Sequence, residues 1–261
     1  MPRLFVIGGS DAGVSAALRA RELAPEWEVS VAVADRFPDF SICGIPYYLS
    51  GETQQAGELA HGHTDDIRKV GVKLLLELPA IKSDPTARKV VINGPSAGES
   101  IERYDRLIVA IGAAPIQPPI RGADLSSVFF LRLIVDALAF HRFPEDRAPR
   151  TVAIVGGGYI GLEVAEALRR RLIEVIIVEM ASSVMTTIDA DLGSKARAEL
   201  EKNGVRLAPK RSVSSIVADA GRLRLEAPDG SHVLADMAIR TIALGDSIGV
   251  ANSSYKPNLA K

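Results

Sequence analysis

Residues 151–179 read TVAIVGGGYIGLEVAEALRRRLIEVIIVE and carry the signals of a strand, a turn, a helix and a second strand. The apolar run at 151–156 predicts a buried strand, because it is short and rich in β-branched residues. Glycines follow it, residues 159–171 predict an amphipathic helix, and a second apolar run at 174–179 predicts another strand. Strands joined through a helix are parallel, so this stretch predicts α/β architecture.

The glycine turn of this stretch fits the pattern G-x-G-x-x-G without substitution. In that pattern the first glycine permits a tight turn, the second lets a pyrophosphate approach, and the third lets the helix pack against the strand. The helix N-terminus offers free N–H groups to phosphate, and an acid after the second strand accepts hydrogen bonds from a ribose. The predicted dinucleotide contacts are Gly156, Gly158, Tyr159, Ile160, Gly161 and Glu179.

A second copy of this pattern stands at the N-terminus, where GGSDAG occupies residues 8–13. It lies between a predicted strand at 3–8 and a predicted helix at 12–24, and a further strand is expected at 29–35. Ser10 replaces the middle glycine and brings a side chain near the phosphate path. The predicted contacts of this turn are Gly8, Ser10, Asp11, Gly13 and Asp35.

The duplication predicts an α/β fold with two Rossmann-like domains built on parallel sheets. Two dinucleotide sites in one chain also favour a flavin paired with a nicotinamide, because hydride passes directly between them. The proline-rich stretch at 115–119 predicts a stiff connection between the domains. We therefore expect one domain at 1–122, a second at 123–245 and a tail at 246–261.

Further elements fill both domains. Residues 72–112 predict short strands, the last of which ends before Gly112. In the second domain, residues 189–203 predict a helix and residues 205–244 predict strands around a turn at 228–230.

The composition is that of a soluble globular protein, with 47% hydrophobic residues, 24% charged residues and a net charge of −1. This balance argues against a nucleic-acid partner. The N-terminus predicts a strand and no signal peptide, and no apolar stretch is long enough for a membrane span, so a cytoplasmic protein is expected. His61 and His63 with nearby Asp65 and Asp66 favour a solvated loop, and no metal site is predicted.

Cys43 is the chain's single cysteine and lies in FSICGIPYY at 40–48. A free cysteine is often a small buried hydrophobe. Here Ser41 is a candidate helix cap and 43–50 could form a short helix, with Pro46 tolerated in its first turn. A thiol at a helix N-terminus is more reactive, so the residues leave a structural and a functional interpretation open.

Taken in order, the first glycine turn, SICGIPYY at 41–48, YDRLIVAIG at 104–112 and GYIGLE at 158–163 resemble the single-cysteine pyridine nucleotide-disulfide oxidoreductases. That branch includes coenzyme A-disulfide reductases, NADH oxidases and NADH peroxidases. The resemblance implies FAD on the first turn, NAD(P)H on the second and Cys43 as the redox thiol over the flavin. It implies that Tyr159 gates the nicotinamide pocket beside Glu163.

By the same resemblance, Ser41 and Gly112 are expected to contact the flavin. Gly245 and Asp246 are either the end of the strand that closes the nicotinamide domain or a remnant of a later flavin-binding motif. Family members continue into the rest of the flavin domain and a homodimerisation domain, so the resemblance implies a C-terminally shortened chain with an incomplete flavin domain.

The resemblance favours an enzyme that passes a hydride from NADH to FAD and on through Cys43 to a small disulfide such as coenzyme A disulfide. Asp11 stands where the oxidases and peroxidases usually have histidine, which favours disulfide reduction. NADH is preferred over NADPH, because Glu179 would repel a 2′-phosphate. Two alternatives stay open: a shortened, non-catalytic nucleotide-binding protein, and a flavin reductase that passes electrons from NADH to an acceptor without a thiol.

Overall fold

The computed structural model describes residues 1–95, 98–112, 118–131, 133–141 and 149–241. The chain forms two compact units. Of the described residues, the first unit contains those at 1–41 and 57–112, and the second contains those at 42–56 and 118–241. Each unit is described by itself.

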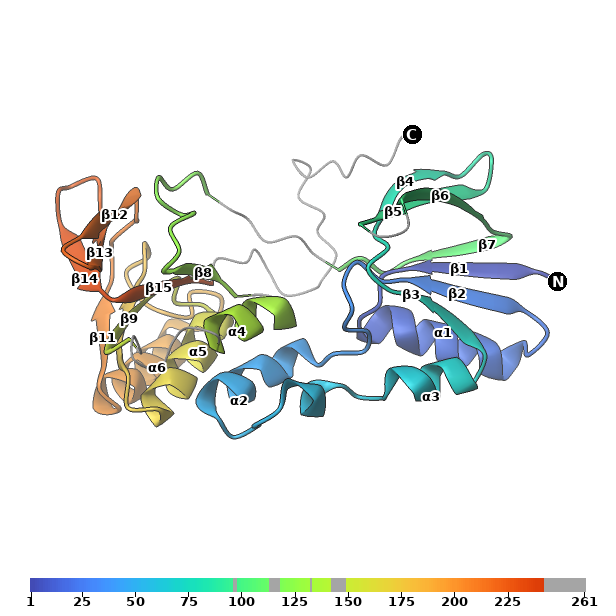
Figure 1. Cartoon of the computed structure of the whole chain (residues 1–261). Coiled ribbons are helices and arrows are strands. Elements are labelled where there is room, and N and C mark those ends of the chain that lie inside the picture. Colours follow the sequence, from blue (N-terminus) through green and yellow to red (C-terminus); the bar gives the residue numbers. More distant parts are fainter. Residues whose placement is uncertain (96–97, 113–117, 132, 142–148, 242–261) are drawn as a thin grey trace. The chain divides into compact units, whose positions relative to one another are not determined.

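The first unit is built on a parallel sheet with strand order β3-β2-β1-β7. Helices α1 and α3 lie on one side of this sheet, and the antiparallel strands β4, β5 and β6 lie on the other (Figure 1). The elements are β1 (Arg3–Ile7), α1 (Asp11–Leu23), β2 (Glu28–Ala32), a 3-10 turn η2 (Ala56–Leu59), α3 (Thr64–Lys69), β3 (Val72–Leu75), β4 (Ala80–Asp84), β5 (Lys89–Gly94), β6 (Gly98–Arg103) and β7 (Arg106–Val109).

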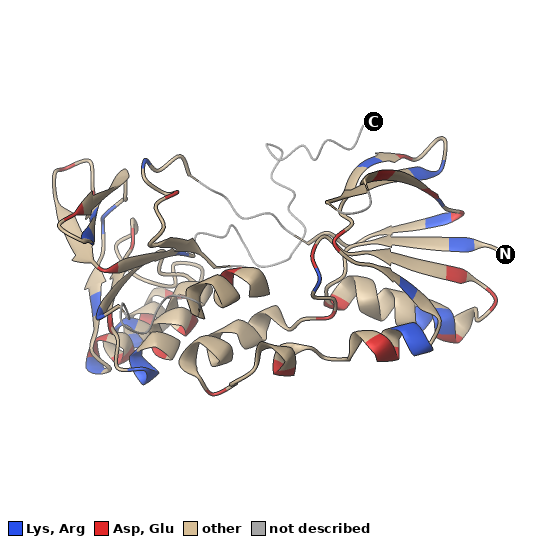
Figure 2. Ribbon diagram, viewed as in Figure 1, with Lys and Arg blue, Asp and Glu red and all other residues tan. Residues whose placement is uncertain are grey.

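Strand β1 is buried on both faces, which explains its uninterrupted apolar sequence. Leu4 and Val6 pack with Val14 of α1, whereas Phe5 packs with Ile92 of β5 on the opposite face. The outer face of α3 carries both charge signs (Figure 2), and Asp66 pairs there with Lys69 at 2.7 Å.

The second unit is built on a five-stranded parallel sheet with strand order β11-β10-β9-β15-β8. An antiparallel sheet of β12, β13 and β14 packs against it. The elements are a 3-10 turn η1 (Ile42–Gly44), α2 (Ile45–Ser50), β8 (Val128–Phe130), α4 (Ile134–His141), β9 (Thr151–Val155), α5 (Tyr159–Arg170), β10 (Glu174–Val178), α6 (Ala190–Lys202), β11 (Val205–Ala208), β12 (Ser215–Asp219), β13 (Arg222–Glu226), β14 (His232–Ala235) and β15 (Met237–Arg240).

The core of the second unit lies on both faces of β9, all of whose residues are buried. Ala153 and Val155 pack with Leu223 and Leu225 of β13 between the two sheets. On the other face, the buried side of α5 includes Val164 and Leu168. Alternate residues of β9 therefore pack against the antiparallel sheet on one face and against α5 on the other.

The predicted α/β fold with parallel sheets is confirmed. The strands expected at 3–8, 29–35, 151–156 and 174–179 are present, and each ends one to three residues earlier because the chain turns away there. The helix expected at 189–203 is α6. The domain boundaries after residues 122 and 245 stay predictions.

Candidate dinucleotide and thiol site

The two glycine turns have the same backbone conformation. Gly8 has φ +115° and Gly156 has φ +116°, a region that residues with a side chain rarely adopt. A Cβ at Gly13 would collide with the carbonyl oxygen of Gly8, and a Cβ at Gly161 would collide with that of Gly156. Glycine at the last position therefore lets each helix begin directly against its turn.

The residues preceding the two helices also correspond. Ser10 has φ −90° and ψ −176°, and Gly158 has φ −81° and ψ −173°. A Cβ at Gly158 would meet no atom within 4 Å, which explains why the first turn tolerates serine. Asp11 and Tyr159 begin the two helices, and the first N–H groups of a helix lack intrahelical acceptors. Both turns can therefore bind a phosphate group.

Glu179 lies at the second turn, as its sequence position predicts. Its Oε2 accepts a hydrogen bond from the Gly157 N–H at 2.6 Å, and its Oε1 accepts one from the Ala181 N–H at 2.7 Å. The Glu179 carbonyl oxygen accepts a hydrogen bond from the Arg211 N–H at 2.9 Å. The carboxylate is thereby fixed beside the second glycine turn.

Asp35 of the first unit is held differently. It follows β2 by three residues, and its Oδ1 accepts a hydrogen bond from the Phe37 N–H at 2.8 Å. Burial raises the pKa of Asp35, and the neighbouring charge of Glu77 raises this pKa further, against the hydrogen bond from Phe37. Gly9 is the counterpart of Gly157, and a Cβ at Gly9 would collide with the Val33 side chain.

A charged cluster lies beside the first turn. His61 Nε2 is 3.6 Å from Asp11 Oδ1, and both side chains are more than half exposed. The N–H of buried Asp39 donates to the Gly9 carbonyl oxygen at 2.7 Å. Burial raises the pKa of Asp39; the charge of His61 lowers this pKa and that of Asp11 raises it. His61 therefore lies beside two carboxylates, although within the described residues no three His, Cys, Asp or Glu side chains form a metal-binding group.

Cys43 lies in the 3-10 turn that precedes α2, and it is exposed. The helix expected at 43–50 is thus present in shorter form, with Pro46 in its first turn. The prediction that Ser41 caps this helix is wrong, because the 3-10 turn moves the helix start to Ile45. The residue at the N-cap position is Gly44, which has no side chain with which to cap the helix.

Helix α2 packs against α5, the helix that begins at the second glycine turn. A cavity of about 270 Å³ lies between them. Its lining includes Cys43 and Glu163, which lies one helical turn after Tyr159. The remaining lining residues are Pro46, Tyr47, Ser50, Glu52, Glu166, Ala167 and Arg170. The structure thus brings the predicted redox cysteine to the predicted nucleotide-binding helix.

Arg170 and His141 stabilise this arrangement. Arg170 pairs with Glu52 at 2.6 Å and with Glu166 at 2.9 Å, which links the end of α2 to α5. His141 Nε2 donates to the Tyr48 carbonyl oxygen at 2.9 Å, and the two rings lie 4.2 Å apart. Burial lowers the pKa of His141. The contacts of Arg170 with Glu52 and of His141 with Tyr48 join residues 118 and 93 positions apart, and sequence reasoning missed them because no local pattern encodes them.

The other predicted contacts are placed as follows. Ile160 is half-buried in the first turn of α5, and Gly112 is exposed after β7 with φ +64°. Ser41 donates its N–H to the Leu59 carbonyl oxygen at 2.8 Å. Gly245 and Asp246 lie outside the described residues. Within the described part of the chain, no helix combines the length and apolarity that membrane crossing requires.

Comparison with known proteins gives consistent matches. The family described as pyridine nucleotide-disulphide oxidoreductase matches residues 2–249. A curated relative named NADH oxidase from Methanocaldococcus jannaschii is 31% identical over 97% of this chain and 56% of its own length. A relative from Pyrococcus horikoshii, named NAD(P)H coenzyme A polysulfide/persulfide reductase, is 32% identical over 86% of this chain and 52% of its own length.

Solved structures similar to this chain include proteins of related names. The water-forming NADH oxidase from Lactobacillus brevis bound to NADH has a TM-score of 0.86 at 26% identity, over 94% of this chain and 54% of that one. An NAD-dependent persulfide reductase from A. fulgidus has a TM-score of 0.85 at 27% identity, over 93% of this chain and 46% of that one. The chain thus spans about half the length of these proteins.

Proposed function

The chain belongs to the pyridine nucleotide-disulphide oxidoreductase family, and from this premise we propose that it binds FAD and NADH and reduces a small disulfide through Cys43. The observation that carries this proposal is the shared cavity of Cys43 and Glu163 between α2 and α5. The exposed Cys43 thiol and the helix that begins at the second glycine turn are thereby adjacent. Coenzyme A disulfide is the substrate that we favour; the P. horikoshii relative is named for reduction of a coenzyme A polysulfide or persulfide.

The first turn fits the diphosphate of FAD. The tight turn at Gly8 and the start of α1 form a cradle of the kind that accepts phosphate. Asp11 adds a negative charge to this cradle, and His61 at 3.6 Å offsets it when protonated. Ser10 supplies a hydroxyl at the position that is glycine in the second turn.

The second turn fits NADH. The space beside Gly158 is open, so a diphosphate can approach the N-terminus of α5. Glu179 is already beside the turn and can accept hydrogen bonds from ribose hydroxyls, whereas a 2′-phosphate would be repelled. Tyr159 is half-exposed at the mouth of this turn, where we propose that it gates access to the nicotinamide.

Cys43 would act as a nucleophile toward the disulfide. Its thiolate attacks one sulfur of R–S–S–R, forms a mixed disulfide Cys43–S–S–R and releases one thiolate R–S⁻. Bound FAD would supply two electrons taken from NADH, which cleave the mixed disulfide to the Cys43 thiolate and a second R–S⁻. Cys43 is the only cysteine of the sequence, so this thiol has no partner for a disulfide within the chain and would form its mixed disulfide with the substrate.

The absorbance spectrum of the purified chain tests cofactor binding. We expect a flavin spectrum that NADH bleaches under anaerobic conditions and that coenzyme A disulfide restores. A colourless protein that does not take up added FAD would contradict the proposal and favour a non-catalytic nucleotide-binding protein. A flavin that reduces dyes but no disulfide would favour the thiol-independent reductase.

A further inference from the structure

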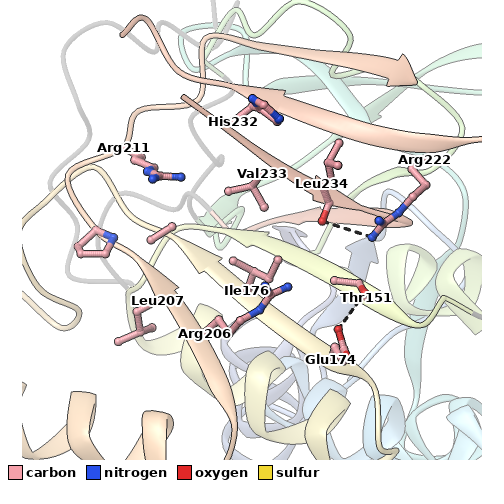
Figure 3. A pocket seen from close by; sticks show the side chains of 12 residues that line it. Thr151, Glu174, Ile176, Arg206, Leu207, Arg211, Arg222, His232, Val233 and Leu234 are labelled. Atoms are coloured by element: carbon pink, nitrogen blue, oxygen red, sulfur yellow. Dashed lines mark hydrogen bonds between the residues drawn. The ribbon is translucent and has the colours of Figure 1, made fainter. Parts of the chain in front are cut away.

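A second groove, of about 640 Å³, lies on the second unit. It is lined by the parallel strands β9, β10 and β11 and by β13 and β14 of the antiparallel sheet (Figure 3). Ile176 and Val233 form an apolar floor and are exposed by only 6% and 9%. None of the predicted dinucleotide contacts lines this groove, although the backbone of Glu179 is hydrogen-bonded to that of the lining residues Ala208 and Arg211.

The groove has a strongly basic lining. In Figure 3 the guanidinium groups of Arg206, Arg211 and Arg222 surround Ile176 and Val233. The positive charge of Arg222 is partly neutralised, because its Nε lies 2.9 Å from Asp236 Oδ1. Among the described residues, the side chains of Arg206 and Arg211 form no ion pair or hydrogen bond, although the charge of Arg211 contributes to lowering the pKa of Asp229.

Negative charge in the lining is small. Glu174 is the one acidic residue among the lining residues, and it accepts a hydrogen bond from Thr151 Oγ1 at 3.2 Å. His232 adds a further positive charge when it is protonated. Three arginines therefore face one carboxylate in the groove, and a concave surface with one sign of charge concentrates ions of the other sign.

This combination suits a particular class of ligand. Guanidinium groups bind phosphate oxygens in a bidentate manner, and several of them arranged around one space match a chain of phosphates better than a single carboxylate. The apolar floor can receive a ring, on which a guanidinium also stacks. The volume lies within the range of small-molecule sites, about 300–1,000 Å³.

We propose that this groove binds a diphosphate or triphosphate group, with Arg206 and Arg211 as its main contacts and Arg222 as a supporting one. The titration below distinguishes two sources of this group: a nucleotide, whose base would lie on Ile176 and Val233, and a phosphate compound free in solution. This site is additional to the dinucleotide sites proposed above and does not depend on them.

Isothermal titration with ADP, inorganic pyrophosphate and adenosine tests the proposal in the full chain. The informative variant is Arg206→Gln/Arg211→Gln. The matched control is Arg197→Gln/Lys202→Gln, which removes the same charge from α6, where both residues pair with glutamates outside the groove. NADH titration of each variant reports whether the second glycine turn is intact.

We expect ADP or pyrophosphate to bind the groove of the wild-type chain and the control, and to bind the groove variant at least about tenfold more weakly. Tighter binding of ADP than of pyrophosphate would identify a nucleotide as the ligand, and equal binding would identify the free phosphate compound. Protection of Arg206 and Arg211 from phenylglyoxal by the same probes, read by mass spectrometry, would place the ligand in the groove even where the glycine turns also bind it.

Three results would overturn the proposal. One is the absence of ADP and pyrophosphate binding at millimolar concentration and low salt. Another is an equal loss of affinity in the groove variant and the control, which would indicate a general charge effect. The third is adenosine binding as tight as ADP binding, because adenosine carries no charge for the arginines.

Discussion

The two glycine turns share a backbone and differ in what surrounds it. Gly8 and Gly156 have φ values within one degree of each other, at +115° and +116°. At the second turn, Glu179 binds the Gly157 N–H, and the cysteine-bearing helix α2 packs on α5. At the first turn, the Asp35 carboxylate accepts a hydrogen bond from the Phe37 N–H and from no N–H of the turn that is described.

This comparison separates the common function of the two turns from their individual functions. The shared backbone fits a diphosphate in both units. The neighbouring carboxylate and helix decide what else each unit can do. The second unit alone combines a fixed acid, an open approach at Gly158 and a cavity that contains Cys43. Five substitutions test this division.

The largest effect is expected for Cys43→Ser. A serine hydroxyl forms no mixed disulfide, so NADH-dependent disulfide reduction should fall by roughly a thousandfold or more, as for loss of other catalytic nucleophiles. Reduction of a dye by NADH should continue. Tyr47→Phe, which alters another residue of the same cavity and retains the thiol, is the control. Unchanged disulfide turnover in Cys43→Ser would make the cysteine a bystander.

The next largest effect is a difference in the free energy of unfolding between two alanine substitutions in the second turn. In Gly161→Ala the new methyl group collides with the Gly156 carbonyl, and overpacking of this kind costs about 1–3 kcal/mol. In Gly158→Ala the methyl group meets open space, so the free energy of unfolding should change little while NADH binds more weakly. Denaturant unfolding and NADH titration measure both quantities. Equal destabilisation by the two variants would contradict the assigned roles.

A smaller effect is expected for Glu179→Gln. Glutamine still accepts a hydrogen bond from Gly157, but it lacks the charge that repels a 2′-phosphate. The preference for NADH over NADPH should therefore fall by about tenfold, or ~1.4 kcal/mol. Titration with both nucleotides measures this ratio, and Glu201→Gln on the surface of α6 is the control. A ratio that stays at the wild-type value would show that another residue sets the preference.

The smallest effect is expected for Asp35→Asn in the first unit. Burial raises the pKa of Asp35 above its ordinary value of 3.8, so the ionised form is disfavoured in the folded state. Wild-type stability is therefore lost as the pH rises through and above that value, and asparagine avoids this loss. The variant should melt at a higher temperature than wild type at pH 7 and at the same temperature at pH 3. A constant difference across this range would argue against the titration of Asp35 as its cause.

The sequence predicted the elements around each turn because their signals are local. Apolar runs such as 174–178 and the glycine spacing at 156–161 are read directly along the chain, and both units have the predicted order of strand, helix and strand. The helix after Cys43 was also predicted, but its start was not, because a 3-10 turn and an α-helix have similar local sequence signals.

By itself, the sequence determined the α/β fold, the duplicated turns and the cysteine as a candidate redox group. Only the tertiary structure placed Cys43 beside Glu163, His141 against Tyr48 and three arginines around one groove. The reason is physical. Backbone conformation and strand or helix periodicity depend on neighbouring residues, whereas these contacts depend on how distant helices and sheets pack, which no local pattern records.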